Sequence, residues 1–392
     1  MQFNPLSPEF RLNPYPTYDL LRQHAPIFYW ERWQHYFLSR YDDCSALLRD
    51  NRLGQGESNE EWAPDSQKDL VRLQKDWVLF KNPPDHTRLR GLVYKAFTPR
   101  VVEQMRETIQ TITDRLLDTV QDKGEMDLIA DLAYPLPVTV ISEMLGIPRE
   151  DQDRFQEWSN ALARSLDLTD DSAVYDRASE AAAVFTDYLA DLAEQRRRQP
   201  QNDLLSALVA VEEEGERLTA NELYATSSFL FVAGHETTIN LIGNGTLALL
   251  RHPDQFALLK GDLGLVKTAV EEFLRYDSPV QMTSRLAHEE IAYKGHIFPR
   301  GTQISFLLAA ANHDPERFEN PHQLDITRQK NQHLSFGNGI HYCLGAPLAR
   351  LEGEIAFTTL LRRLPNLALA TETPAYSDNY LLRGLKCLPL TF

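Results

Sequence analysis

Cysteine is scarce in this chain of 392 residues, with Cys44, Cys343 and Cys387 as its full complement. The three lie far apart, so no CxxC pair exists and the usual zinc-site spacings are excluded. An odd, small number of cysteines is typical of proteins in a reducing cytoplasm. The sequence therefore predicts a cytoplasmic protein without a disulfide framework.

Long apolar runs and an excess of basic charge are also lacking. The longest apolar candidates, Phe229–Ala233 and Ile304–Ala311, fall far short of the roughly 20 residues of a membrane helix. The first residues show neither the basic nor the apolar region of a secretory signal, so we expect no membrane anchor. A net charge of −16 argues against nucleic acid as a partner, although a local basic patch could still bind an acidic protein.

Helical patterns cover most of the chain. Residues 100–215 alternate helix-like segments and breaks, and Thr219-x-x-Glu222 is a capping box that begins a long helix ending near Arg251. Short strands are expected at Ile27–Trp30, at His35–Ser39 and in several segments after Pro279. Residues 1–20 are expected to be extended and residues 52–82 to form an irregular loop. The prediction is a mainly α fold with a smaller β-rich lobe, in a single domain spanning residues 1–392.

The stretch around Cys343 carries the clearest chemical signal. It reads HLSFGNGIHYCLGAPLARL from His333, with glycines on both sides of Cys343 and a helix-like run from Ala346. A cysteine just before a helix start is close to the positive end of the helix dipole, which favours the thiolate. The glycines allow tight backbone turns and the close approach of a flat ligand. A thiolate in such a loop suits the axial position of haem iron, whereas a buried structural cysteine is the ordinary alternative.

The apolar middle of the long helix is interrupted by Gly234, His235, Glu236, Thr237 and Thr238. Polar groups in a core helix are costly without partners, and glycine weakens a helix by about 1 kcal/mol relative to alanine. Both costs favour a functional interruption in which the helix widens locally. Ile239 stands where a zinc-binding HExxH helix needs its second histidine, so that interpretation fails.

Two further motifs pair charged residues on one helix face. His86 and Arg90 in HTRLR are four residues apart and suit an anionic partner, although a solvated helix face is the usual alternative. Glu272 and Arg275 in EFLR are three apart and can form a bidentate salt bridge.

In this order, HTRLR, AGHETT, EFLR and FGNGIHYCLG resemble the motifs of the cytochrome P-450 family, and with the lengths between them they cover nearly the whole chain. The soluble bacterial type is the better match. The resemblance implies haem b bound non-covalently apart from a Cys343–iron bond, since no CxxCH motif is present. It implies a monooxygenase that activates dioxygen with electrons from a separate ferredoxin- or flavodoxin-type donor, because no GxGxxG fingerprint is present. The donor should dock near the Cys343 loop, with Arg88 and Arg350 as candidate contacts.

The resemblance also assigns residues. Gly234, Glu236 and Thr237 would serve oxygen activation and proton delivery, and Glu272, Arg275 and Arg317 would form a structural clip. The expected haem contacts are Ala233 and the set His86, Arg90, Arg285, Phe336, Gly337, His341 and Gly345. The expected lining of the substrate pocket is Val78, Leu79, Phe80, Val280, Met282, Thr283 and Leu382, although the first three could simply pack beneath the loop.

For the substrate, the resemblance implies only a small lipophilic compound that is hydroxylated or epoxidised. Two other functions stay open: a haem-thiolate sensor of a ligand or gas, and a peroxide-driven oxygenase of the same fold. The acid–alcohol pair Glu236–Thr237 favours the dioxygen-dependent enzyme, because neither alternative needs a proton relay.

Overall fold

The computed structural model describes residues 4–56, 60–213 and 218–392. The chain forms two compact units. Unit 1 contains residues 1–55, 113–133 and 237–392, and unit 2 contains residues 56–112 and 134–236. The helices α7 (Arg106–Asp118) and α12 (Ala220–Leu250) each run from one unit into the other.

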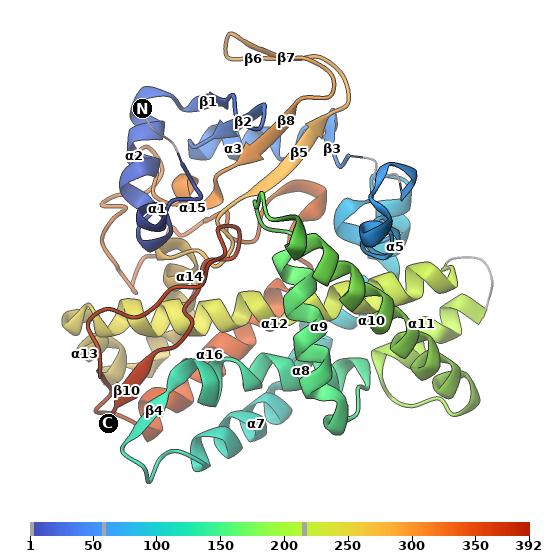
Figure 1. Cartoon of the computed structure of the whole chain (residues 1–392). Helices are drawn as coiled ribbons and strands as arrows, with labels where there is room; N and C mark the ends of the chain where they lie inside the picture. Colours follow the sequence, from blue (N-terminus) through green and yellow to red (C-terminus); the bar gives the residue numbers. More distant parts are fainter. Residues whose placement is uncertain (1–3, 57–59, 214–217) are drawn as a thin grey trace. The chain divides into compact units, whose positions relative to one another are not determined.

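Unit 1 holds the described strands, in three sheets. The largest has the order β1-β2-β8-β5-β3, so strands from the two ends of the chain lie side by side (Figure 1). β1 and β2 form an antiparallel hairpin, and β2 pairs in parallel with β8, with His35 opposite Gln303. The strands are β1 (Ile27–Trp30), β2 (His35–Leu38), β3 (Leu53–Gly54), β4 (Glu125–Asp127), β5 (Thr283–Ala287), β6 (Ile291–Tyr293), β7 (His296–Phe298), β8 (Gln303–Phe306), β9 (Ala368–Leu369) and β10 (Pro389–Thr391).

The helices of unit 1 include α3, which packs on this sheet, and α16, which follows the cysteine loop. They are α1 (Pro8–Leu12), α2 (Tyr15–His24), α3 (Tyr41–Leu47), α13 (Pro253–Gly261), α14 (Val266–Tyr276), α15 (Leu308–Ala311) and α16 (Ala346–Arg363). A core of fully buried side chains joins the sheet to α3 and includes Leu38, Cys44, Ile304 and Phe306. The hairpin and α3 are thereby fixed to strands from the far end of the chain.

Unit 2 is helical. Its helices are α4 (Lys68–Gln74), α5 (Asp85–Tyr94), α6 (Pro99–Gln104), α8 (Pro135–Leu145), α9 (Gln152–Arg164), α10 (Ser172–Arg198) and α11 (Leu204–Glu213). A buried aromatic cluster joins α9, α10 and α12: the ring centroids of Phe155 and Phe185 are 4.8 Å apart, and those of Phe155 and Phe231 are 5.2 Å apart. This cluster anchors α9 against the first half of α12.

The helical fold with small sheets confirms the predicted fold class. The capping box is also confirmed, because the Thr219 N–H donates to Glu222 at 2.9 Å and the Glu222 N–H donates to the Thr219 hydroxyl at 3.2 Å. Two local predictions are wrong. Residues 1–20 contain α1 and most of α2, since Pro8 lies at the start of α1, where its missing N–H costs nothing. Residues 52–82 contain α4, which buries Leu70 and Leu73.

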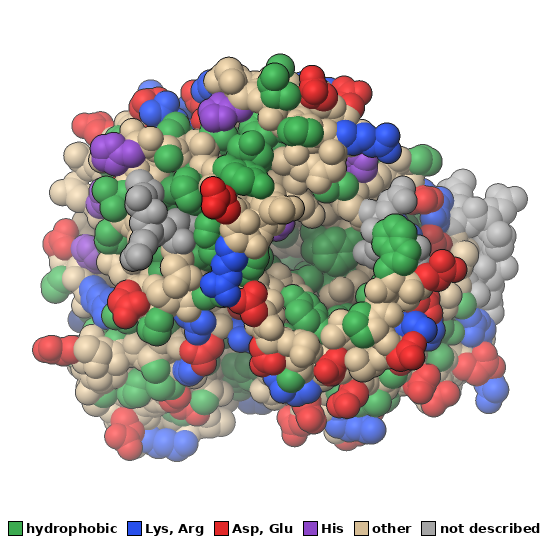
Figure 2. Space-filling model, turned by 45° about the horizontal axis from the view of Figure 1, so that its top comes forward, with side chains coloured by type: hydrophobic (Ala, Val, Ile, Leu, Met, Phe, Trp, Pro, Cys, Tyr) green, Lys and Arg blue, Asp and Glu red, His purple; other side chains and the backbone are tan. Residues whose placement is uncertain are grey.

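The described part of the chain contains no helix long and apolar enough to cross a membrane. On the face drawn in Figure 2, acidic and basic side chains are interspersed.

Candidate functional site

The loop before α16 folds back on itself around Cys343. The Cys343 N–H donates to the Phe336 carbonyl at 2.9 Å, and Gly337 and Gly339 take positive φ values of 71° and 74°. A Cβ on Gly339 would lie 2.3 Å from the Leu48 carbonyl oxygen. Glycine is thus required at position 339 by both conformation and space. The loop is fixed against the end of α3, and Cys343 lies three residues before α16.

Polar and aromatic contacts tie the loop to α14. Arg350 on α16 donates to Glu271 on α14 at 2.6 and 2.9 Å, and its guanidinium lies 4.5 Å above the centre of the Phe336 ring. His333 also bonds to Glu271, at 3.2 Å. Burial raises the pKa of Glu271, but the bonds from His333 and Arg350 outweigh it and hold the pKa at about 2. Glu271 is therefore a permanent anion that clamps the loop between two helices.

Arg285 on β5 is a buried cation that faces a cavity beside this loop. The cavity has a volume of about 240 Å³, and Gly339, Ile340 and Leu48 also line it. Arg285 is 5% exposed and donates to the Thr283 hydroxyl and the Ser284 carbonyl, at 3.2 and 2.7 Å. No carboxylate within residues 4–56, 60–213 and 218–392 pairs with it, and burial lowers its pKa to about 10. A buried cation of this kind needs an anion to offset its desolvation.

The remaining predicted haem contacts are divided between the units. Gly345 has open space where a side chain would start, and His341 ends a 3-10 turn two residues before Cys343; both residues are in unit 1. In unit 2, His86 and Arg90 lie one turn apart on α5, where His86 is buried and Arg90 is half-buried. Ala233 is exposed in the apolar middle of α12, beside the buried Val232. Each unit thus presents its own predicted contacts, which the structure does not test.

The predicted widening of the long helix at Gly234 is wrong, because α12 is continuous from Ala220 to Leu250. A Cβ on Gly234 would lie 3.1 Å from two carbon atoms of Ile141 on α8. Glycine at this position therefore serves the close approach of α8 rather than a break in the helix. Glu236 and Thr237 follow on the same unbroken helix. Burial raises the pKa of Glu236, and Arg164 opposes that effect.

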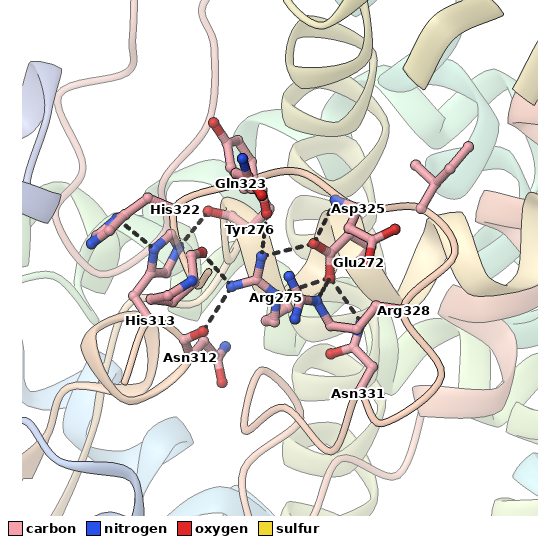
Figure 3. A network of polar contacts seen from close by, with 12 residues as sticks. Glu272, Arg275, Tyr276, Asn312, His313, His322, Gln323, Asp325, Arg328 and Asn331 are labelled. Atoms are coloured by element: carbon pink, nitrogen blue, oxygen red, sulfur yellow. Dashed lines mark hydrogen bonds and ion pairs between the residues drawn. The ribbon is translucent and has the colours of Figure 1, made fainter. Parts of the chain in front are cut away.

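Glu272 and Arg275 on α14 form a bidentate ion pair in which both side chains are fully buried (Figure 3). The two bonds measure 2.7 and 2.8 Å. The other N–H groups of Arg275 donate to three backbone carbonyls, those of Asn312, Pro321 and Gln323. Glu272 accepts a backbone N–H from Asp325 and a side-chain amide from Asn331. The pair thus fastens the irregular segment 312–331 onto α14.

The third member of this clip differs from the prediction. Arg317 bonds to Gln332 and lies 4.9 Å above the Tyr41 ring, away from Glu272. Arg328 donates to Glu272 at 3.1 Å instead (Figure 3). Arg317 is exposed, whereas Arg328 lies between Asp325 and Asn331, which both donate to Glu272. No motif around Arg328 distinguishes it in the sequence, so it could be found only from the fold.

Residues predicted to line the substrate pocket are present in both units. Val280 and Leu382 form an antiparallel bridge in unit 1, which brings the chain's last turns next to the start of β5. Met282 is 4% exposed and Thr283 is half-buried. In unit 2, Val78, Leu79 and Phe80 form one 3-10 turn, in which Phe80 stacks on Trp77 with their planes 9° apart. Their role as pocket lining stays a prediction.

A polar groove of about 730 Å³ lies between α14, α16 and the segment 317–332. Its charged lining consists of Lys267, Arg317, Arg328, Lys330, Arg350, Glu271 and Glu354. The cations outnumber the anions there, in contrast to the chain as a whole. Arg350 is already paired with Glu271, and in unit 2 Arg88 is paired with Glu222 and Asp85. Lys267 and Lys330, which the sequence did not single out, are exposed cations of this groove, as is Arg317.

Comparison with known proteins gives concordant matches. The profile of the family described as Cytochrome P450 matches residues 18–263 and 259–379. The polyketide biosynthesis cytochrome P450 PksS of Bacillus subtilis (strain 168) is 43% identical over 404 residues, which cover 100% of this chain and 98% of the relative. The crystal structure of P450BioI in complex with a hexadec-9Z-enoic acid-ligated acyl carrier protein superposes with a TM-score of 0.94 at 42% identity, covering 98% of this chain and all of that chain. The structure of myxobacterial CYP267B1 with myristic acid gives a TM-score of 0.91 at 41% identity, covering 99% and 98%.

Proposed function

Since the chain belongs to the cytochrome P450 family, we propose that Cys343 is the thiolate ligand of its haem iron. The protein is a haem-thiolate monooxygenase that acts on lipophilic substrates. The observation that carries the Cys343 assignment is the folded-back loop, in which glycines with positive φ place this cysteine three residues before α16. Cys44 is fully buried beneath the sheet, and Cys387 precedes β10, so neither belongs to a comparable loop.

The residues present fit a haem group. Arg285 is a buried cation facing a cavity beside the Cys343 loop and lacks a carboxylate partner among the described residues, which suits a propionate. Gly345 leaves room for a flat group next to the thiol. We assign further propionate contacts to His86, Arg90 and His341, and face contacts to Ala233, Phe336 and Gly337. When bound, the haem supplies the reductive activation of dioxygen.

Glu236 and Thr237 would handle the protons of the reaction. A hydroxyl is both donor and acceptor, so Thr237 can hold a water molecule and pass a proton through it. Glu236 is 25% exposed, and burial raises its pKa, so its acid form persists to a higher pH than that of a solvated carboxyl. The carboxyl would take protons from solvent and deliver them to the water at Thr237. Because α12 is continuous, Glu236 and Thr237 are consecutive residues of one regular helix, and their backbone positions are fixed relative to each other.

Electrons would come from a separate ferredoxin- or flavodoxin-type protein. We place its docking site on the groove lined by Lys267 and Lys330, which adjoins the helix that begins after Cys343. An excess of cations in one groove of an acidic chain attracts an acidic donor surface. Arg88 and Arg350, the contacts expected from the sequence, are engaged in ion pairs within the chain.

The substrate is proposed to be an extended acyl or polyketide chain. The name of PksS refers to polyketide biosynthesis, and the structures of P450BioI and CYP267B1 hold fatty-acyl ligands. Candidate contacts in this chain are the bridged pair Val280 and Leu382, with Met282 and Thr283 beside them. Val78, Leu79 and Phe80 remain candidates in unit 2.

Both units are proposed to form one catalytic domain working in the cytoplasm. The chain passes between the units several times, within α7 and within α12 among other places. None of the three cysteines is in a disulfide in the described structure, which suits a reducing compartment.

The carbon monoxide spectrum of the reduced protein tests the central assignment. The wild type should show the red-shifted Soret band of thiolate-ligated haem, and Cys343→Ala should lose it. Cys387→Ala is the matched control, since Cys387 is also partly exposed. A normal thiolate band in Cys343→Ala would refute the assignment. Turnover with an electron donor under oxygen, compared with peroxide alone, separates the monooxygenase from a peroxide-driven enzyme or a sensor.

A further inference from the structure

His235 is a fully buried polar residue whose role the proposed function leaves open. It lies on α12 directly before Glu236 and is 0% exposed. Its Nδ1 lies 2.7 Å from the Phe231 carbonyl oxygen one turn earlier. Its Nε2 lies 3.4 Å from the Ser159 hydroxyl on α9 and 3.9 Å from Oε2 of Glu236. The ring therefore has two polar neighbours at one nitrogen.

The short distance to the Phe231 carbonyl fixes the tautomer. A carbonyl oxygen only accepts, so Nδ1 must carry the hydrogen that bridges 2.7 Å. Burial lowers the pKa of His235 to about 4, so the ring is neutral near pH 7. Nε2 is then unprotonated, and its lone pair points toward Ser159 and Glu236. The contact with Glu236 is consequently not an ion pair.

An imidazole lone pair responds differently to the two forms of a carboxyl group. A carboxylic acid can donate its O–H to Nε2 after a small rotation from 3.9 Å. A carboxylate has no hydrogen to donate and places negative oxygen against the lone pair, which is repulsive. The same nitrogen thus attracts protonated Glu236 and repels the ionised side chain.

We propose that His235 is a positioning residue: its Nε2 holds the protonated carboxyl of Glu236 between proton deliveries and repels the carboxylate that remains once the proton has been delivered. The inference rests on the proposed role of Glu236 as proton carrier. In one cycle the O–H···Nε2 bond opens first, the carboxyl turns its O–H to the water at Thr237, and the O–H then breaks as the proton passes to that water. The carboxylate then swings away, takes a proton from solvent and returns.

Groups of unit 2 around Glu236 favour this alternation. Arg164, at the end of α9, lowers the pKa of Glu236 and so attracts its ionised form, although Arg164 also pairs with Asp167 at 3.2 Å. The Tyr134 hydroxyl, just before α8, is buried without a hydrogen-bond partner among the described residues. Burial raises the pKa of Tyr134, and Asp153 and Glu236 raise it further, so it remains protonated. His235 offers a lone pair to the acid, while Arg164 offers charge to the carboxylate.

The competing explanation is that the hydrogen bond between the Ser159 hydroxyl and Nε2 of His235 serves only to hold α9 against α12; we call this bond the clasp. Ser159 has one hydroxyl hydrogen and lies 3.0 Å from the Gln156 carbonyl, nearer than its 3.4 Å to Nε2. The bond from Ser159 to His235 is therefore weaker than the bond from Ser159 to the Gln156 carbonyl. Removing Ser159 would eliminate the clasp but leave Nε2 available to Glu236, which makes the two roles separable.

The test is an infrared titration of the resting holoenzyme. The C=O stretch of protonated Glu236 is identified by its loss in Glu236→Gln and followed against pH. His235→Phe keeps an aromatic ring but removes the acceptor, so the apparent pKa of Glu236 should fall by roughly half to one pH unit, the effect of one net hydrogen bond. Ser159→Ala should leave that pKa unchanged or higher. His235→Gln, which can present an amide oxygen, should lie nearer to wild type and serves if His235→Phe does not fold.

An unchanged pKa in His235→Phe, equal falls in His235→Phe and Ser159→Ala, or a fall in His235→Gln as large as in His235→Phe would overturn the proposal. The titration does not depend on turnover, so it is separate from the proposed relay. If the pKa shifts as expected but Glu236→Gln leaves product yield intact, His235 positions the carboxyl and the relay is wrong. If Glu236→Gln impairs turnover but the pKa does not move, the relay stands and the His235 proposal is refuted.

Discussion

Removing the guanidinium of Arg275 should destabilise the protein far more than removing an exposed arginine. Arg275→Ala leaves the fully buried Glu272 with Arg328 as its remaining cation among the described residues, and it frees three backbone carbonyls from their donor. Breaking a buried ion pair from one side costs about 3–5 kcal/mol. With an unfolding entropy of about 2.1 cal/mol/K per residue over 392 residues, that loss corresponds to a fall of roughly 4–6 °C in Tm.

Thermal unfolding of the holoprotein, followed by far-ultraviolet circular dichroism, measures this difference. The matched control is Arg72→Ala, because Arg72 pairs with Glu60 and Asp69 but its side chain is 50% exposed. An exposed pair is worth at most about 1 kcal/mol, so the control should shift Tm by about 1 °C or less. Arg275→Lys should fall between the two, since an ammonium cannot reproduce the planar set of five bonds. Equal shifts in Arg275→Ala and Arg72→Ala would refute the reasoning.

Three further outcomes follow from the site. Thr237→Ala should retain haem and substrate binding but divert electrons to hydrogen peroxide, so that the product formed per nicotinamide consumed falls by about tenfold or more. A wild-type ratio of product to nicotinamide would contradict this, and Thr237→Ser is the control. Arg285→Ala should weaken haem binding by roughly 10- to 100-fold, the cost of one charge-assisted hydrogen bond, in a haem-transfer assay; an unchanged affinity would exclude a propionate contact. Lys267→Glu with Lys330→Glu should slow reduction by an acidic donor and flatten its dependence on ionic strength, unlike Lys123→Glu on an exposed turn.

Elements with a strong local signal could be predicted from the sequence. The hairpin strands at Ile27–Trp30 and His35–Leu38 are confirmed to within one residue, and α16 begins at Ala346 as expected. These segments combine clear periodicity with a turn or glycine at their ends. Residues 1–20 were harder because proline is compatible both with extended chain and with the first turn of a helix, and here it starts α1.

Interactions that depend on tertiary structure could not be predicted in the same way. A glycine in an apolar helix indicates a special position, but only the fold reveals that Ile141 occupies the space beside Gly234. The Glu272–Arg275 pair can be predicted because the two residues are three apart on one helix. Arg328 reaches Glu272 from a loop without periodicity, so its contact cannot be predicted. Histidine spacing likewise says nothing of the direction in which His235 presents its lone pair.

The parallel pairing of β2 with β8 has a consequence for how the chain folds during synthesis. β2 leaves the ribosome long before β8, and the Asn338–Ser45 hydrogen bond joins residues 293 positions apart. The first hairpin must therefore wait, with its partner edge unpaired, until nearly the whole chain has been translated. Unpaired strand edges favour association with other chains, and long-range pairing slows folding. A chaperone that covers residues 27–38 should consequently raise the yield of folded protein, whereas slower elongation before residues 303–306 should lower it.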